Sequence, residues 1–356
     1  MIVHLLLVAG ALAQGTENQG FDAHGLHVAP LDGGTHDPVV VQRPDDFVQG
    51  DWYTGGLLEY ALAPLVGIDD RGERVAVVNN VLALNASAGA AAHERVRFDL
   101  GVPLFLGTSG VAGGGTSIGD IRLASTIMAI RPADGVLLGD NALALGVMPH
   151  VDLPTGNQTR FLGQQSVSGG FVSAMSVGDE DWTFTSNVGL QFNPALDRSN
   201  LTGSDTLLVG LAAGFTTSAD VHLIAELHGE APFARSDVAG TGGPLEAILS
   251  GRYVRDDGSH FLGGVAWGMS PGVGSAALRL FVGGGFGAVA GENGLTERTR
   301  EGRASDAPPR SGPPCDEPGC SVQFTVSAFY KGTAMPGSKV LLAGPQRFEA
   351  WTEGEP

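Results

Sequence analysis

One ten-residue segment carries the side chains best able to bind a metal ion or to transfer a proton. Residues 221–230 read VHLIAELHGE and place His222, Glu226, His228 and Glu230 two or four positions apart. Imidazole and carboxylate groups are zinc ligands and general acids or bases. In an extended strand, however, His222 and His228 would lie about 20 Å apart, since each residue advances about 3.3 Å. The spacing favours a row of polar groups over a metal centre, and we predict neither a metal nor a cofactor.

A second pattern is that of a hydrolase nucleophile. Gly115, Ser117 and Gly119 form a G-x-S-x-G motif. A nucleophile elbow needs a strand before the serine and a helix after it. Here a glycine-rich loop precedes the serine and a strand-like segment follows it. We therefore predict no catalytic residues and no enzymatic activity.

Residues 221–230 belong to a two-residue alternation that recurs about twelve times. Successive side chains of a strand point to opposite faces, so each segment has one apolar and one polar face. Gly, Pro, Asn and Asp bound the segments, which have about the length that a tilted strand needs to cross a bilayer. The expected strands are 51–62, 75–91, 94–105, 118–131, 136–151, 165–177, 181–193, 204–217, 220–232, 244–255, 259–270 and 275–290.

The connections between these segments alternate in length. Those after the odd-numbered strands are mostly long, such as 64–74 and 107–117, whereas 92–93 and 218–219 are tight turns after even-numbered strands. Transmembrane barrels have long loops outside and short turns in the periplasm, while Greek-key sandwiches lack this alternation. We predict an all-β, up-and-down antiparallel outer-membrane barrel of about twelve strands over 51–291. Both termini would then lie in the periplasm.

Charge separates the two faces of the expected barrel. The formal net charge of −18 argues against a nucleic-acid partner, which requires a basic surface. Charges facing lipid cost a few kcal/mol each near the midplane, so the charged face should be the inner one. The expected luminal polar network comprises Glu59, Arg97, Asp99, Asp120, Arg122, Asn187, His222, Glu226, Glu246, Arg252 and Arg279. The expected lipid-facing or interfacial aromatic residues are Tyr60, Trp182, Phe184, Tyr253 and Trp267.

The regions flanking the barrel have distinct compositions. Residues 1–13 have the apolar core and A-x-A site of a signal peptide, and 14–50 would form a periplasmic lead-in or a plug. The Pro-rich linker 292–320 contains Cys315 and Cys320, for which export favours a local disulfide. Residues 321–356 alternate again and resemble part of an Ig-like β module, which could contact a periplasmic partner.

Several short motifs give the chain a family resemblance. They include Gly119-Asp120-Ile121-Arg122-Leu123, Leu153-Pro154-Thr155-Gly156 and Pro244-Leu245-Glu246-Ala247 followed by Gly251-Arg252-Tyr253. Over roughly residues 20–290 the sequence resembles the N-terminal outer-membrane barrels of OmpA-type proteins, especially the myxobacterial kind. In that family a peptidoglycan-binding domain usually follows the barrel. We do not expect one in this sequence, and anchoring to the cell wall is not implied.

Three functions are compatible with the sequence. The first is a non-enzymatic barrel in outer-membrane lipid that acts as a structural protein or a narrow pore. The second is a transporter for small or hydrophobic solutes, with the N-terminal segment as its plug. The third is a soluble secreted β-sandwich that binds a ligand.

Overall fold

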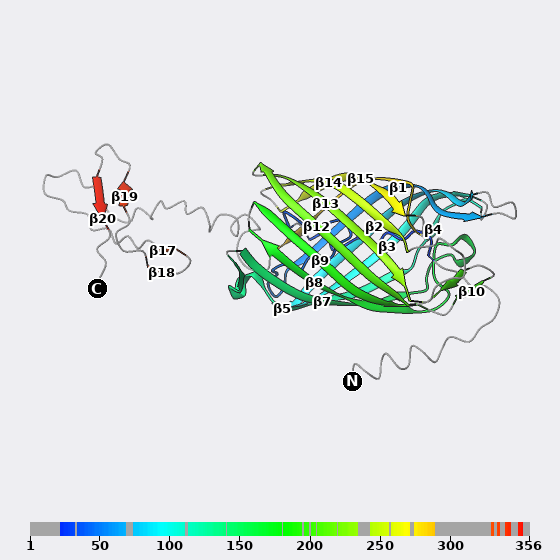
Figure 1. The fold of residues 1–356 in the computed structure, drawn as a ribbon, viewed down its shortest axis with the longest axis horizontal. Helices are drawn as coiled ribbons and strands as arrows, with labels where there is room; N and C mark the ends of the chain where they lie inside the picture. Colours follow the sequence, from blue (N-terminus) through cyan, green and yellow to red (C-terminus); the bar gives the residue numbers. More distant parts are fainter. Residues whose placement is uncertain are drawn as a thin grey trace, which may run out of the picture. The chain divides into compact units, whose positions relative to one another are not determined.

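The computed structural model contains a closed antiparallel β-barrel of twelve strands (Figure 1). The structure describes residues 22–32, 34–68, 74–110, 113–139, 141–179, 181–193, 196–198, 201–203, 205–218, 220–233, 243–255, 258–270, 274–288, 329–330, 333–334, 339–342 and 348–351. These fall into two units, Met1–Arg303 and Ala304–Pro356. The all-β prediction is confirmed, because the only described helices are the 3₁₀ turns η1 (Pro132–Asp134) and η2 (Gln158–Arg160).

Every barrel strand pairs with its neighbour in the sequence. The strands are β1 (Trp52–Ile68), β2 (Arg74–His93), β3 (Val96–Gly110), β5 (Ile121–Ile130), β7 (Asn141–Leu153), β8 (Ser168–Gly178), β9 (Trp182–Phe192), β12 (Thr206–Ser218), β13 (Val221–Pro232), β14 (Leu245–Val254), β15 (His260–Ser270) and β16 (Leu278–Ala288). Pairing of β16 with β1 closes the ring and sets Ala288 opposite Trp52. The first strand therefore begins at the end of the barrel where the last one finishes.

The described residues also form shorter strands besides the twelve of the barrel. Of these, β4 (Ser117–Ile118) pairs with β3 and β6 (Leu137–Leu138) pairs with β7, while β10 (Leu196–Arg198) and β11 (Leu201–Gly203) form a separate hairpin. In the second unit, β17 (Phe329–Tyr330) pairs with β18 (Thr333–Ala334), and β19 (Lys339–Leu342) pairs with β20 (Phe348–Trp351). Among the described residues, no helix is long and apolar enough to cross a membrane.

Burial follows the two-residue alternation of the sequence. In β13, His222 and Glu226 are buried, whereas Leu223, which shares the other face with Val221, is 46% exposed. The five aromatic residues expected on the lipid side have 36–44% of their surface exposed. The barrel thus has an apolar outer face, and its charged groups turn inward.

The first strands are longer than expected. Strands β1 and β2 have 17 and 20 residues and pair out to Ile68 and Arg74, across the segment expected to be a loop. The proline at position 64 suggested that loop, since proline cannot donate a ladder hydrogen bond. In the structure the register shifts between Leu62 and Leu65, and Ala63 adopts a φ of 48°. The proline falls in this irregularity, where no ladder donor is needed, and the hairpin continues beyond it.

Several expected features lie outside the described residues. These are the signal peptide over 1–13, the Pro-rich linker over 292–320 and the disulfide between Cys315 and Cys320.

Candidate functional site

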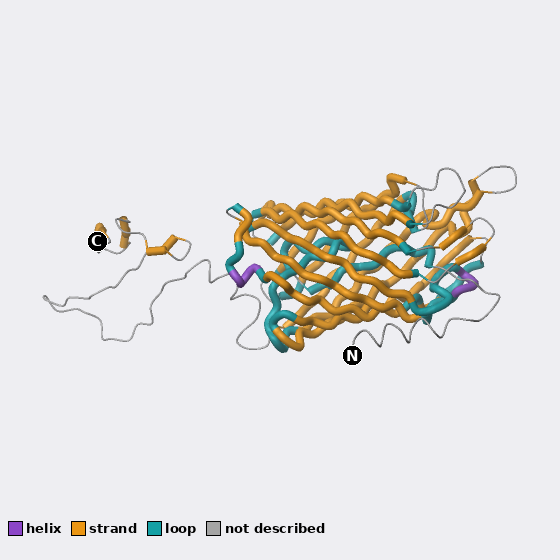
Figure 2. Tube along the Cα trace, turned by 60° about the horizontal axis from the view of Figure 1, so that its bottom comes forward, coloured by secondary structure: helices purple, strands orange, loops and turns teal. Residues whose placement is uncertain are grey.

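The interior of the barrel is occupied by residues 22–50, called here the luminal segment. It forms no strand, and its Ala29 amide donates to the Val39 carbonyl at 2.8 Å, which folds it back on itself. Side chains of β1, β3, β9, β13, β14 and β16 bond to it, as the contacts described below detail. A segment that meets strands all around a closed ring must lie inside it, and Figure 2 shows loop-coloured chain running through the barrel. Leu31, Val39 and Val41 are buried there.

Glycines in the wall leave room for this segment. A Cβ atom added to Gly55 of β1 would lie 2.8 Å from Leu31 Cβ, and one on Gly214 of β12 would lie 2.8 Å from His36 Cβ. One on Gly210 of β12 would lie 3.1 Å from Val41 Cγ2. At Gly55 and Gly214 a side chain would displace the segment, whereas at Gly210 the neighbouring valine would have to shift by only a few tenths of an ångström. The wall and the segment are therefore complementary in shape.

Glu226 of β13 anchors the segment through its backbone. Its carboxylate accepts the amides of three consecutive residues, Val39 at 2.6 Å, Val40 at 2.9 Å and Val41 at 3.0 Å. Among the described contacts, no arginine bonds to this glutamate. Three backbone amides bind the carboxylate instead, since N–H groups that converge on one point form an anion-binding site.

Asn187 of β9 extends this anchor by one residue. Its Oδ1 accepts the amide of Gln42 at 2.6 Å, and its Nδ2 donates to the carbonyl of Gln42 at 2.7 Å. The side-chain amide therefore pairs with the segment as a neighbouring strand would. Two wall residues together fix four consecutive backbone amides.

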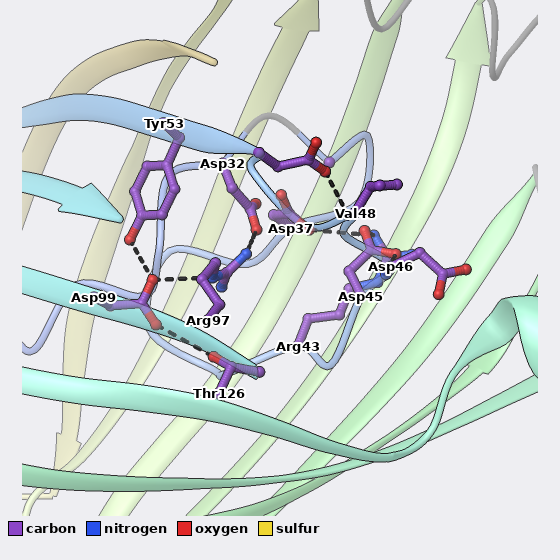
Figure 3. A network of polar contacts seen from close by, with 12 residues as sticks. Asp32, Asp37, Arg43, Asp45, Asp46, Val48, Tyr53, Arg97, Asp99 and Thr126 are labelled. Carbon is purple, nitrogen blue, oxygen red and sulfur yellow. Dashed lines mark hydrogen bonds and ion pairs between the residues drawn. The ribbon is translucent and has the colours of Figure 1, made fainter. Parts of the chain in front are cut away.

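Arg97 of β3 joins the wall to the segment on the opposite side (Figure 3). It bonds to Asp32 of the segment, and its Nε lies 3.0 Å from Asp99 Oδ1. The Tyr53 hydroxyl donates to the same oxygen at 2.8 Å. The guanidinium carbon lies 5.3 Å from the ring centroids of both Phe47 and Tyr53, within cation–π range. Arg97 is thus held by two carboxylates and two aromatic rings.

Arg279 of β16 is fully buried and links three strands to the segment. It donates to Glu59 of β1 at 2.9 Å, to Glu246 of β14 at 3.2 Å and to the carbonyl of His24 at 3.2 Å. Glu59 also bonds to the His24 ring, and His228 Nε2 lies 3.5 Å from Glu246. A buried arginine is tolerated when several acceptors surround it, and this one has them.

Arg252 and two histidines hold the turn of the segment. Arg252 of β14 donates to the Gly34 carbonyl at 3.0 Å and lies 3.5 Å from Asp37. Burial raises the pKa of Asp37 well above its usual range, and the carboxylate of Asp32 adds to the shift. His36 lies 2.9 Å from the hydroxyls of both Thr183 and Thr216, and its ring packs edge-on against His222 at 5.1 Å. Burial lowers the pKa of His36 to about 4.

Arg122 of β5 pairs with Asp152 of β7 beside a small cavity. Its Nε and Nη2 donate to the two carboxylate oxygens at 2.6 and 2.9 Å. Asp120, just before β5, accepts the amides of Gly156 at 2.8 Å and Gln164 at 2.6 Å and so holds the β7–β8 connection. Burial raises the pKa of Asp120 to about 6.

The structure brings the predicted polar residues into several clusters and not into one. Eight of the eleven are buried, and Asp99, Asp120 and Arg122 are partly exposed. That these eleven residues line a lumen stays a prediction. Sequence reasoning missed their partners on the segment, chiefly His24, Asp32, His36 and Asp37. The density of His and Asp over 22–37 was the available signal. In the described part of the chain, no three His, Cys, Asp or Glu residues are grouped as metal ligands.

Comparisons with known proteins point to the outer membrane. A family model described as "Putative MetA-pathway of phenol degradation" matches residues 18–242. An outer membrane channel from Pseudomonas putida F1 aligns with a TM-score of 0.52 at 12% identity, covering 71% of this chain and 99% of that one. The NanC porin aligns at 0.44 with 7% identity over 66% and 98%, and the TodX monoaromatic hydrocarbon channel at 0.39 with 10% identity over 76% and 98%. No curated protein matches. These matches do not confirm an OmpA-type identity.

Proposed function

Because the chain belongs to the family described as "Putative MetA-pathway of phenol degradation", we propose that this outer-membrane β-barrel is a channel for small solutes, closed by its luminal segment. It acts by passage and not by catalysis. The likeness in fold to the outer membrane channel of Pseudomonas putida F1 supports this assignment. The short turns and both termini of the chain then face the periplasm, as the loop lengths predict.

The observation that carries the proposal is the attachment of the segment by replaceable contacts. Hydrogen bonds and ion pairs hold its polar groups, and every one of those groups can instead bond to water once the lumen fills. Leu26, Leu31 and Val39 also pack against apolar side chains of the wall. Displacement of the segment, wholly or in part, opens a path lined by the polar face of twelve strands. A barrel of this size lies between those filled by side chains and the wide porins.

A purely structural barrel is the second candidate. It is favoured by how little space remains inside, since the two best-defined cavities measure about 50 and 10 Å³. A barrel of that kind would not conduct under any voltage. The resemblance to OmpA-type proteins belongs to this alternative.

A reversible cross-link separates the candidates. Val41→Cys with Gly210→Cys places two thiols where Cγ2 of the valine and the added Cβ lie 3.1 Å apart, close enough for a disulfide. The native cysteines are replaced by serine. In planar bilayers we expect opening events from the reduced protein, none after oxidation, and recovery with reductant.

The controls are the Gly210→Cys single variant and heat-modifiable migration on gels, which reports an intact barrel. Conductance that persists after oxidation would mean that solutes pass without moving the segment. If neither the reduced double-cysteine variant nor the wild-type protein conducts, the result would favour the structural barrel.

A further inference from the structure

The largest of the described cavities lies between the start of the luminal segment and the wall formed by β2, β3, β5 and β7. Its volume is about 50 Å³. At about 10–15 Å³ for each enclosed water, it has room for a few waters, or for a small ion that keeps some of them. Its lining includes three carboxylates, those of Asp22, Asp120 and Asp152, and a single guanidinium, that of Arg122. The lining therefore carries an excess of negative charge.

The excess charge belongs to Asp22 and Asp120. Arg122 forms its paired hydrogen bonds with Asp152, which uses the one guanidinium of the lining. Asp120 accepts two backbone amides, and Asp22 Oδ1 accepts the amide of His24 at 2.8 Å. Among the described contacts, no cationic side chain bonds to either carboxylate. Two carboxylates at one cavity repel each other, and a cation between them would turn that repulsion into attraction.

The histidines of the lining do not supply the missing positive charge. His24 bonds to Glu59, which also accepts from Arg279. Burial lowers the pKa of His27 well below its usual range, so this ring is neutral. The cavity is therefore suited to a positively charged ligand.

Three uncharged side chains add oxygen ligands to this lining. Asn85 and Ser87 belong to β2, and Gln164 belongs to the β7–β8 connection. Asn85 Nδ2, Ser87 Oγ and Gln164 Oε1 have no partner among the described contacts, although Asn85 is only 7% exposed. Buried polar atoms normally have a hydrogen bond or another ligand. Half a turn of its amide group presents the oxygen of Asn85 in place of the nitrogen, so all three residues can offer an oxygen atom.

Both carboxylates meet the same stretch of the β7–β8 connection. Asp22 forms an isolated antiparallel bridge with Leu162, and Asp120 accepts the amide of Gln164 at 2.6 Å. A Cβ atom added to Gly163 would lie 2.7 Å from Asp120 Oδ1, so glycine lets the connection approach this carboxylate closely. The connection thus brings the two acidic residues and the Gln164 side chain to one cavity.

We propose that this cavity binds one calcium ion through its acidic and uncharged oxygen atoms, with water completing the coordination shell. The ligands are Asp22, Asp120, Asn85, Ser87 and Gln164. Ca²⁺ takes about six to eight oxygen ligands in a flexible geometry, whereas Mg²⁺ requires a near-ideal octahedron and gives up its waters reluctantly. With only two acidic ligands, the site differs from a group of three acidic, His or Cys ligands, which the described residues lack. We expect a dissociation constant of about 0.1–1 mM, the range of extracellular calcium modules.

The ion joins three parts of the chain. Asp22 belongs to the luminal segment, Asn85 and Ser87 to the wall, and Gln164 to the β7–β8 connection. Bound calcium therefore stabilises the docked start of the segment. It also keeps Asp120 ionised, so the protonation of this residue is followed in the presence of a chelator. The site does not rest on the proposed channel, because a purely structural barrel would bind the ion equally well.

Calorimetry with calcium chloride tests the site in the full-length, chelator-treated protein in detergent. The net charge of −18 attracts cations to the whole surface, so the test compares variants of equal charge. Asp22→Asn should weaken the site at least about tenfold. Asp45→Asn is the matched control, because it removes the same charge from the same segment at a residue that is also partly exposed but does not line the cavity. Magnesium should bind at least about tenfold more weakly than calcium.

A space-filling variant tests the location without changing any charge. Gly101 lines the cavity, and a Cβ atom added to it would meet only Arg122 Cβ, at 3.7 Å, so valine fits the wall and takes up part of the cavity. Gly101→Val should abolish calcium binding while the barrel migrates normally on gels.

Thiol labelling tests the stabilisation of the segment. Ala23 is 1% exposed, so Ala23→Cys, with the native cysteines replaced by serine, reacts with a maleimide only when the start of the segment opens. Calcium at about ten times its dissociation constant should slow labelling about tenfold, and this protection should disappear when Asp22→Asn is added. Equal calcium affinity of Asp22→Asn and Asp45→Asn would overturn the proposal and assign the ion to the acidic surface. Binding unchanged by Gly101→Val, or equal affinity for magnesium, or labelling that calcium does not slow, would also overturn it.

Discussion

Replacing Glu226 by glutamine should loosen the luminal segment without removing volume. The carboxylate accepts three amides, two of them at Oε2 and the third, from Val39, at Oε1. The glutamine oxygen can keep the pair at Oε2, but its NH₂ group then points at the Val39 amide. One buried donor loses its acceptor, at about 1–3 kcal/mol, and two charge-assisted bonds become neutral, at about 1 kcal/mol each. Relief of the buried charge offsets part of this sum. We take about 3 kcal/mol as the net loss, which is about a hundredfold in the equilibrium between docked and released segment.

Thiol labelling measures that equilibrium. Val41 is 1% exposed in the docked segment, so Val41→Cys reacts with a maleimide only when the segment opens. With the native cysteines replaced by serine, Glu226→Gln should raise the labelling rate about a hundredfold. The control is Glu94→Gln in the β2–β3 turn, where the half-exposed glutamate pairs with Arg131. Equal labelling rates in the two variants would refute the role of Glu226 as the anchor.

Three further predictions concern charge and pH. Arg279→Met leaves Glu59 and Glu246 without their shared cation and should lower the free energy of unfolding by about 3–5 kcal/mol in urea titrations, whereas the surface variant Arg131→Met should change it far less. Leu211→Arg, on the outer face in the middle of β12, should cost about 2–4 kcal/mol in lipid vesicles, and Ser218→Arg at the strand end at most about 1 kcal/mol. Burial raises the pKa of Asp120 from 3.8 to about 6. Between pH 3.8 and pH 6 this carboxyl group is therefore protonated in the native state but ionised in the unfolded state. Its contribution to stability should fall as pH rises from about 4 to 6; Asp120→Asn should remove that slope from urea titrations, and an unchanged slope would assign it to another group.

The barrel was predictable because its pattern is local. Alternation within β13 fixes the faces of Leu223 and Glu226 from ten residues of sequence, and lipid outside makes any slip of register costly. The strand count follows from the same repetition. The strand ends are less certain, as Ala63 and its proline neighbour show, because a bulge depends on the pairing of two strands.

The partners of the inward residues were not predictable in this way. The bond between Glu226 and Val39 joins positions 187 residues apart, and the luminal segment has no period that would reveal its path. Nothing local distinguishes an arginine partner for Glu226 from three backbone amides. The clusters follow from closure of the ring, which brings distant strands around one irregular chain.

The distribution of partners indicates how the segment could leave. Without it, Arg97 keeps Asp99, and Arg279 keeps Glu59 and Glu246, so these pairs of the wall survive intact. Arg252 and Glu226 differ, because their described hydrogen bonds and ion pairs are all to the segment. Release would turn one cation and one anion, on the neighbouring strands β14 and β13, toward the lumen. Water entering the opened barrel can solvate both, whereas the docked state must satisfy them with backbone groups and Asp37. Among the charged wall residues, Arg252 and Glu226 thus lose all of their described partners when the segment leaves, so a single substitution at either of them should shift the balance between docked and released segment.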